Sequence, residues 1–368
     1  MKTVCKENQC TSCTACINIC PAKCIHIINE PSYSNAVIDS AKCLNCKQCY
    51  TVCQQNHFLI NMRNQPLFLI GKMNDEKDSM KSSSGGIATL ISRQIIERGG
   101  YVCGCQFKNG EFLHCLTNKI NEIENFRGSK YVKSNLGLIF GQIKRVIRNS
   151  KVLFIGTPCQ VYGLQKYLAS FKLLDNLYTI DLVCHGTPQQ ILLTKYLNEE
   201  YKSKSIQSIQ FRDKTNISLI INSNYKLRKV YDPYTIAFLN GLTYTNNCYS
   251  CQFSNTNRVG DITLGDAWGI GEKGSTNGLS LIISNTKKGA SLLDSLGSKA
   301  SLKVFDKKLL IDNNKQLYQP SKIPIKRNWF FSNINNTTFR KLIKKIYKKA
   351  YFRQKMKEIL LRFGFIKS

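Results

Sequence analysis

The 368-residue sequence predicts three parts in order: a small cysteine-rich α+β domain, a larger α/β domain on a mixed sheet, and a basic C-terminal helical tail. Three observations predict this order. Two closely spaced cysteine motifs occupy residues 1–60, short apolar segments alternate with helical ones through the middle, and lysine and arginine crowd residues 326–368. A hydrophobic fraction of 42% is sufficient for substantial buried cores, so we expect a globular protein.

The cysteine-rich segment, residues 1–60, holds two copies of one motif. Each copy has the spacing C-x2-C-x2-C-x3-C, and the second copy begins at Cys43, 33 residues after Cys10. Three closely spaced thiolates can wrap one 4Fe-4S cube, while the fourth cysteine reaches across to the other cube. The ligand sets expected on this rule are Cys10, Cys13 and Cys16 with Cys53, and Cys43, Cys46 and Cys49 with Cys20.

This segment resembles a bacterial-type ferredoxin with two 4Fe-4S clusters, which implies an α+β ferredoxin-like N-terminal domain. The apolar stretches CIHIIN and NAVIDS fit the short paired strands of such a domain. Gln54 stands where the motif has proline, a change that weakens the turn but removes no ligand. A pair of zinc sites is the alternative, although tetrahedral zinc takes four ligands rather than interleaved sets of three plus one. Cys5 and Cys24 lie outside the motif and are expected to be ordinary small side chains.

The next segment changes from loop to helix to strand at SSSGGIATL. Ser82, Ser83 and Ser84 are expected to cap a helix whose apolar stripe ends at Gly99 and Gly100. A helix start made of small residues can also bind phosphate, but an ordinary cap explains such a stretch more often. A second polar turn, GSKYVKS at residues 128–134, offers groups for an anion and an aromatic ring, or is a solvated loop.

Five short apolar segments are expected to be strands of an α/β sheet with some parallel pairing: 151–156, 177–184, 205–211, 261–268 and 279–284. Ligands in such sheets gather beyond the carboxyl ends of the strands, where Cys159 and Cys184 fall. Cys248 and Cys251 have the spacing that lets two thiolates bind one metal centre. We therefore expect these four cysteines to hold a third 4Fe-4S cluster, with zinc or separate buried thiols as alternatives.

The motifs SSSGGIATL, GSKYV, GTPCQVYGL, DLVCHGTP, CYSCQFS and GDITLGDAWG, in this order, resemble the coenzyme F420 hydrogenase/dehydrogenase beta-subunit family. The resemblance implies an α/β mixed-sheet flavin-binding domain over residues 78–325 that holds FAD and an iron-sulfur cluster. No catalytic residue is identified: Asp261 and Asp266 could act near the flavin, but carboxylates at strand ends more often fix loops. By motif, it implies FAD contacts at Ser84, Gly85, Gly86, Thr89, Ser129, Lys130 and Tyr131, and cluster ligands at Cys159, Cys184, Cys248 and Cys251.

The tail, residues 326–368, carries thirteen Lys or Arg residues and a single acid, Glu358. Apolar residues recur there at steps of three and four, which predicts one or two basic amphipathic helices. Such a helix either lies on an anionic membrane surface or packs its apolar face on the domain. The formal net charge of +30 also suits nucleic acid, but the interleaved aromatic residues of single-strand binders are not evident, so nucleic acid is not expected.

Neither a secretory signal nor a membrane-spanning apolar run is evident, so we expect a cytoplasmic location or peripheral contact at the inner face of the membrane. Seventeen cysteines in a reducing compartment favour metal binding over disulfides. The predicted function is an iron-sulfur flavoprotein oxidoreductase that moves electrons between a ferredoxin-type donor or acceptor and a two-electron acceptor through 4Fe-4S clusters and FAD. Its partner is expected to be a redox protein or a small-molecule electron acceptor. The alternative is a non-catalytic electron-transfer subunit or partner protein, which could serve cell-surface polysaccharide synthesis. Similar ferredoxin-fused chains are associated with that process in hosts that do not make the deazaflavin coenzyme, so this coenzyme is not assumed.

Overall fold

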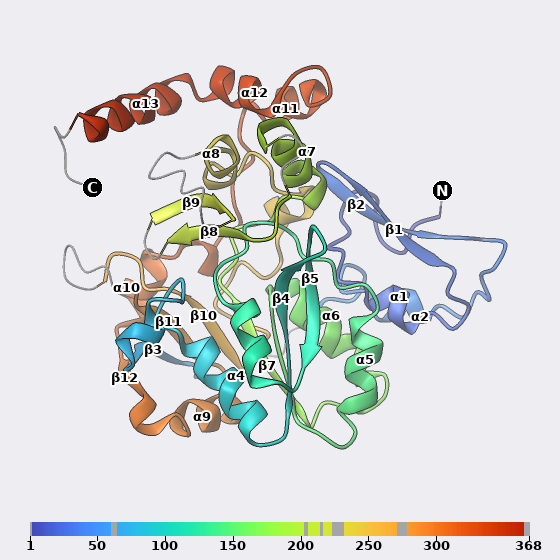
Figure 1. Ribbon diagram of the computed structural model, residues 1–368. Coiled ribbons are helices and arrows are strands. Elements are labelled where there is room, and N and C mark those ends of the chain that lie inside the picture. The colour runs from blue at the N-terminus through green and yellow to red at the C-terminus, as the bar shows by residue number, and fades with distance from the viewer. Residues whose placement is uncertain are drawn as a thin grey trace.

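The structure is a computed structural model that describes residues 2–59, 65–201, 205–213, 216–222, 232–270 and 278–363 (Figure 1). Residues 364–368 of the predicted tail lie outside this range. Within it, no helix is long and apolar enough to cross a lipid bilayer. The main body is an eight-stranded sheet in the order β12-β3-β11-β10-β7-β6-β4-β5. The strands are β3 (Leu67–Met73), β4 (Tyr101–Lys108), β5 (Glu111–Thr117), β6 (Val152–Gly156), β7 (Leu177–Leu182), β10 (Ile262–Asp266), β11 (Ser280–Ser284) and β12 (Ala300–Val304).

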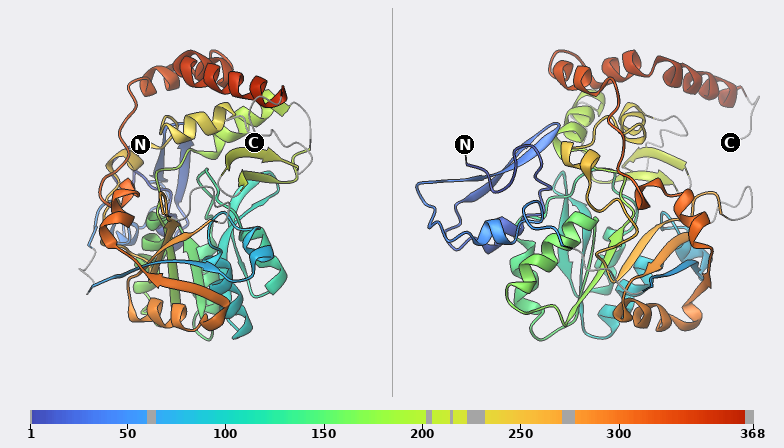
Figure 2. Two further views of the ribbon diagram at one scale, coloured as in Figure 1. Left: turned by 90° about the vertical axis from the view of Figure 1, so that its left-hand side faces the viewer. Right: turned by 180° about the vertical axis from the view of Figure 1, so that it is seen from behind.

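The sheet is mixed, as the sequence predicts. Its four central strands, β10, β7, β6 and β4, are parallel, and the strands on both flanks are antiparallel. Because alternate residues of a strand face opposite sides, Leu153 packs with α4 (Ile87–Glu97) while Phe154 packs with α5 (Ile139–Val146) and α6 (Pro158–Ala169). Helices therefore cover both faces of the sheet (Figure 1 and Figure 2), and the parallel strands are apolar on both sides.

The N-terminal part pairs β1 (Ile25–Glu30) with β2 (Tyr33–Ile38) in an antiparallel hairpin, which confirms the two predicted strands. It also carries two short helices, α1 (Ala15–Ile19) and α2 (Gln48–Thr51), whose starts are 33 residues apart like the cysteine motifs. α1 packs against the main body at α5 and α6. The side-chain amide of Asn18 donates from Nδ2 to the carbonyl oxygen of Gly137 at 3.1 Å, so a polar contact also joins the two parts.

A second core lies beside the large sheet and is rich in aromatic residues. It gathers the hairpin of β8 (Ile209–Asp213) and β9 (Asn216–Ile221), helices α7 (Gln190–Tyr201) and α8 (Pro233–Leu239), and the tail helices α11 (Arg327–Asn333) and α12 (Phe339–Ile346). The remaining elements are α3 (Glu76–Ser79), η1 (Ile120–Phe126), η2 (Asn246–Ser250), α9 (Lys287–Asp294), η3 (Gly297–Lys299), α10 (Lys307–Asp312), η4 (Lys315–Leu317) and α13 (Lys348–Arg362).

After α11, the described part of the tail forms two basic helices, α12 and α13, with different environments. α12 buries Phe339, Leu342 and Ile343 against α7 and α8, and Arg340 pairs with Glu200 of α7. α13 packs on this core near its start, where Tyr351 accepts a hydrogen bond from Arg340 at 2.9 Å, and its remainder lies at the opposite end of the molecule from α9 (Figure 1). The packing alternative therefore describes α12 and the start of α13.

Two sequence-based expectations differ from the structure. The N-cap of α4 is Gly86, at a φ of 77°, with no side-chain capping bond, so the predicted serine cap is wrong. Ser84 instead donates its hydroxyl hydrogen to the carbonyl oxygen of Leu279 at 3.0 Å, because this loop packs against the sheet. The predicted strand at 205–211 begins only at Ile209 and belongs to the separate β8–β9 hairpin. Segments 151–156, 177–184, 261–268 and 279–284 contain β6, β7, β10 and β11 as expected.

Candidate metal centres

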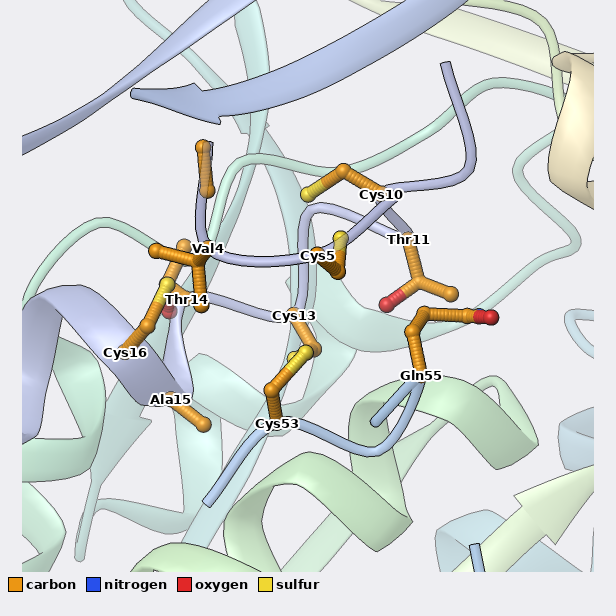
Figure 3. A pocket seen from close by; sticks show the side chains of 11 residues that line it. Val4, Cys5, Cys10, Thr11, Cys13, Thr14, Ala15, Cys16, Cys53 and Gln55 are labelled. Carbon is orange, nitrogen blue, oxygen red and sulfur yellow. The ribbon is translucent and has the colours of Figure 1, made fainter. Parts of the chain in front are cut away.

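Three hollows in the described part of the chain are lined by cysteines, and we call them sites I, II and III. Site I has a volume of about 300 Å³ and brings together the four cysteines of the first predicted ligand set (Figure 3). All four are buried. The residues that line site I are Val4, Cys5, Cys10, Thr11, Cys13, Thr14, Ala15, Cys16, Ala36, Cys53 and Gln55.

Site II, of about 310 Å³, brings together the second predicted set, Cys20, Cys43, Cys46 and Cys49. It lies nearer the surface than site I, because the Cys46 side chain is exposed and its neighbour Leu44 is 68% exposed. α1 connects the two sites, since Cys16 of site I lies on this helix and Cys20 of site II is its C-cap. The backbone positions of Cys16 and Cys20 are therefore about 6 Å apart along the helix axis at 1.5 Å per residue.

The loops around sites I and II repeat the same backbone conformation. Ser12 and Thr14 have φ values of 57° and 59°, and Asn45 and Lys47, 33 residues later, have 53° and 57°. Each non-glycine residue in this left-handed region costs roughly 1–2 kcal/mol. The conformation aims backbone amides at sulfur, since the amides of Ser12 and Asn45 each donate to the Sγ atom two residues earlier at 3.4 Å. Strain of this kind, repeated in two loops, is typical of a functional site.

Each of sites I and II also contains a fifth cysteine that the motif does not predict. Cys5 lines site I, and its hydrogen bond is the largest cause that lowers the pKa of Cys53 to about 7. Cys24 lines site II with its sulfur 3.5 Å from that of Cys20. Neither residue has a regular spacing, so only the three-dimensional contacts reveal its position.

Site III, of about 570 Å³, brings together the third predicted set, Cys159, Cys184, Cys248 and Cys251. Cys159 and Cys184 follow β6 and β7, which are parallel neighbours, so both thiols meet at the carboxyl edge of the sheet as expected. The other two cysteines come from η2 and the residue that follows it. Burial raises the pKa of the Cys159 thiol to about 12, although the nearby Thr157 hydroxyl and the Lys133 charge act in the opposite direction.

Two threonine hydroxyls contact the thiols of site III. Thr157 Oγ1 lies 3.2 Å from the Sγ atom of Cys159, and Thr245 Oγ1 lies 3.3 Å from the Sγ atom of Cys248. Hydrogen bonds to ligand sulfur are one of the means by which a protein tunes an iron-sulfur centre. Thr157 also lines the hollow of site III, and both hydroxyls are placed to tune a centre bound by these thiols.

Among the described residues, no three His, Cys, Asp or Glu side chains are arranged to hold a single metal ion. The thiols of sites I, II and III instead surround hollows, with four predicted ligands around each. Four thiols around one enclosed space are the donor set that a 4Fe-4S cluster takes. In donor chemistry and arrangement, all three sites suit such a group.

Sites I and III share a wall. Thr11 and Gln55 line both hollows. Gln54, which is 1% exposed, donates from Nε2 to Thr11 Oγ1 at 2.9 Å and to the carbonyl oxygen of Cys159 at 2.8 Å. The residue that replaces the ferredoxin proline is thus a hydrogen-bonded bridge between the two sites, and sequence alone gave no signal for this contact.

The two loops that the resemblance assigns to FAD lie beside each other. The amide of Ser129 donates to the Ser83 hydroxyl at 2.8 Å, and Arg127 pairs with Asp78 at 2.7 Å. At Gly85 the first loop packs directly against β3. Only glycine fits there, because a Cβ atom would lie 2.2 Å from the carbonyl oxygen of Gly71.

In the second of these loops, at residues 129–131, the side chains of Lys130 and Tyr131 contact other groups of the protein. Lys130 donates from Nζ to the carbonyl oxygens of Phe126 and Arg127, and Tyr131 stacks on Phe238 with ring centroids 4.3 Å apart. Burial lowers the pKa of Lys130 to about 8. None of the seven residues that the resemblance assigns to FAD lines site I, II or III.

The two remaining carboxylates, Asp261 and Asp266, bind other protein groups, and three cysteines lie outside the three sites. Asp261 accepts hydrogen bonds from the amide and hydroxyl of Thr179 and from the hydroxyl of Thr286, which fixes a loop as expected. Asp266 pairs with Arg212 at 2.7 Å. The thiols outside the three sites are Cys103, which is buried, and Cys105 and Cys115, which are partly buried.

Comparison with known proteins matches residues 149–308 to the family described as the C terminus of the coenzyme F420 hydrogenase/dehydrogenase beta subunit. No curated protein matches the chain. A chain of the xenon-derivatised F420-reducing NiFe hydrogenase complex from Methanosarcina barkeri is similar at 17% identity and a TM-score of 0.49, over 70% of this chain and 91% of that one. The matched family segment includes all four cysteines of site III. Residues 149–308 of this chain are therefore similar to the C-terminal part of the coenzyme F420 hydrogenase/dehydrogenase beta subunit.

Proposed function

We propose that this protein is an iron-sulfur flavoprotein oxidoreductase with 4Fe-4S clusters at sites I, II and III and FAD between the two loops at residues 84–89 and 129–131. The similarity of residues 149–308 to this family supports an iron-sulfur electron-transfer role in an oxidoreductase system. The observation that supports the finer proposal is the arrangement of twelve cysteines as three sets of four, each around one hollow. Bound clusters would supply one-electron transfer and FAD would supply the exchange between one and two electrons.

The exposure of the three sites supports an order for electron flow. Site II opens to solvent at Cys46 and Leu44, so it is the proposed contact for an external redox protein. Site I is buried and is joined to site II by α1 and to site III by the wall of Thr11 and Gln55. On this proposal residues 1–60 are the electron-entry domain, residues 78–325 the flavin and iron-sulfur domain, and residues 326–368 the tail.

A steady-state assay on the anaerobically purified chain tests the function. With dithionite or reduced ferredoxin as donor, we expect one FAD per chain and sustained turnover with a two-electron acceptor such as a quinone or the deazaflavin coenzyme of the family. Turnover is expected because the flavin can collect the two electrons that the clusters deliver singly. A flavin-free protein that exchanges electrons only with one-electron dyes would instead be a non-catalytic relay.

We further propose a cytoplasmic protein whose helix α13 touches an anionic membrane surface at the inner face. Its exposed apolar side chains recur at steps of four, three and four, which places them on one side of the helix. They are Phe352 at 65%, Met356 at 41% and Ile359 at 38% exposure, with Phe363, directly after the last residue of the helix, at 72%. Exposed Lys348, Lys349 and Arg353 accompany them, and basic residues near anionic lipid contribute about 1 kcal/mol each.

Vesicle sedimentation tests the membrane proposal. The double variant Phe352→Asp/Phe363→Asp should lose most of its binding to vesicles that contain anionic phospholipid, because it removes the two most exposed of these four apolar side chains. Ile325→Asp is the matched control, since this residue is 97% exposed but lies outside α13. Substitution is preferable to truncation because α12 is part of the aromatic core. Equal sedimentation of both variants and the unaltered protein would exclude α13 as the contact.

A further inference from the structure

Arg327 belongs to the basic tail but is buried inside the protein. It is the first residue of α11 and is 7% exposed, and among the residues that the structure describes no carboxylate pairs with it. Arg340 of the same tail differs, because 43% of its side chain is exposed and it pairs with Glu200. A buried guanidinium is costly unless acceptors satisfy its N–H groups. The partners of Arg327 therefore indicate what the tail does at this point.

The partners of Arg327 lie on η2, which carries Cys248, and directly before it. Its Nε atom donates to the hydroxyl oxygen of Tyr249 at 3.0 Å. Its Nη2 atom donates to the carbonyl oxygen of Tyr244 at 2.9 Å and to Oδ1 of Asn246 at 2.8 Å. The guanidinium carbon also lies 4.9 Å from the ring centroid of Tyr249, in the range of a cation–π contact. Arg327 therefore binds the chain on both sides of Cys248.

The same guanidinium reaches the N-terminal part of the protein. Ser32 lies in the turn between β1 and β2, and its carbonyl oxygen accepts a hydrogen bond from Nη2 of Arg327 at 3.4 Å. That oxygen also accepts from the backbone amide of Asn246 at 2.9 Å. One side chain therefore joins three parts of the protein: the tail, the β1–β2 hairpin, and the segment that carries Cys248.

We infer that Arg327 is a positioning residue that holds Cys248 and Cys251 in place at site III. The inference rests on the proposed function, which assigns these two thiols to a bound cluster. Thr245, whose hydroxyl lies 3.3 Å from the Sγ atom of Cys248, is within the span 244–249 that Arg327 binds at both ends. The guanidinium thus also fixes the donor of a hydrogen bond to a ligand sulfur. Lysine cannot replace it, because a single ammonium nitrogen does not reproduce the planar fork of donors.

The inferred effect is confined to site III. Arg327 lines none of the three hollows, so it acts on a bound cluster through η2 and not by direct contact. None of the predicted ligands of sites I and II lies in the span 244–251. Loss of the guanidinium should therefore loosen the ligands of one site and leave the other two unchanged.

Removal of iron by a chelator tests the inference on the anaerobically purified, full-length protein. In Arg327→Lys and Arg327→Met, we expect about four of about twelve iron atoms to leave about tenfold faster than in the unaltered protein, since a hydrogen bond to a charged group changes an equilibrium by at least roughly this factor. The electron paramagnetic resonance signal that is missing in Cys159→Ser identifies site III, and only this signal should change its g values. Arg340→Lys and Arg340→Met are the matched controls, because Arg340 pairs with Glu200 instead, and both should keep the unaltered rate and signals.

The two Arg327 variants separate a positioning role from a general one. An unaltered rate and unaltered signals in both variants, or in Arg327→Lys alone, would overturn the inference. Equally fast release from all three sites would also overturn it, because Arg327 would then stabilise the protein as a whole. If neither variant folds, Tyr249→Phe removes a single acceptor of the guanidinium, and a smaller change at site III alone is expected. No change at site III in Tyr249→Phe would then contradict the inference.

A failure of the proposed function is distinguishable from a failure of this inference. An unaltered protein with about eight iron atoms contradicts the third cluster and leaves the thiols of site III free. The rate at which iodoacetamide alkylates Cys248 and Cys251 then decides the role of Arg327. Faster alkylation in Arg327→Lys than in Arg340→Lys supports the inference, and equal rates overturn it.

Discussion

Cys159→Ser is expected to lower the iron content from about twelve to about eight atoms per chain, with an equal fall in acid-labile sulfide, because a 4Fe-4S cluster needs its thiolate ligands. Cys159 is the best choice at site III because its neighbourhood is well determined by hydrogen bonds. It follows β6 at the start of α6, with the Gln54 amide on its carbonyl oxygen. The substitution exchanges one atom, so the loss reports ligation and not a gap in packing. Metal and sulfide analysis of anaerobically purified protein measures it.

Cys115→Ser is the matched control for this experiment. Cys115 is a partly buried cysteine on β5 that lines none of the three sites, so the iron content should stay at about twelve. An unaltered protein with about eight iron atoms, unchanged in Cys159→Ser, would contradict a third cluster. Zinc in place of the missing iron would identify site III as a structural zinc site.

Gly163→Ala is expected to disrupt site I although it improves a helix. In the middle of α6, alanine is favoured over glycine by about 1 kcal/mol. However, a Cβ atom at Gly163 would lie 2.7 Å from the Cβ atom of Cys13 and 2.9 Å from its Sγ atom. Cys13 is buried between α6 and the rest of site I, and overpacking of such a contact costs typically 1–3 kcal/mol. We expect loss of about four iron atoms and a lower melting temperature, measured by iron analysis and thermal unfolding.

Gly141→Ala provides the matched control, because Gly141 also lies within a helix of the main body, α5. A Cβ atom there would meet Asn18 Oδ1 at 3.7 Å, which is an ordinary contact. The control should therefore retain its iron and gain up to about 1 kcal/mol in the free energy of unfolding. Retention of all iron in Gly163→Ala, with the same gain in stability, would show that α6 and the Cys13 loop can separate at no cost.

The sequence predicts features that local chain geometry determines. The spacing of the N-terminal cysteines is sufficient to group them, because short loops allow few arrangements of their thiols. The position of Cys159 and Cys184 follows in the same way, since both come directly after strands that lie next to each other in a parallel sheet. Gly99, at a φ of 76°, ends α4 as the sequence predicts, because glycine tolerates this conformation.

Other features depend on contacts between distant segments, which no local pattern records. From the sequence, Gln54 is only a position where the motif's proline is missing. The structure shows that its side-chain amide donates to the carbonyl oxygen of Cys159. The sequence does not distinguish Lys133 from the many surface lysines, because its hydrogen-bond partner Thr245 lies 112 residues later in the chain. The serine cap fails for the same reason, because Ser84 bonds to Leu279 across the sheet rather than to its own helix.

The place of β3 in the sheet bears on how the protein is made. β3 directly follows the N-terminal part in the chain, yet both of its neighbours, β11 and β12, come more than 200 residues later, at residues 280–284 and 300–304. During synthesis β3 therefore waits as an unpaired strand until most of the chain has left the ribosome, and such edges are prone to aggregate. The sheet therefore cannot form completely around β3 until β11 and β12 have been synthesised. A chain that ended before residue 280 would leave β3 without either of its partner strands.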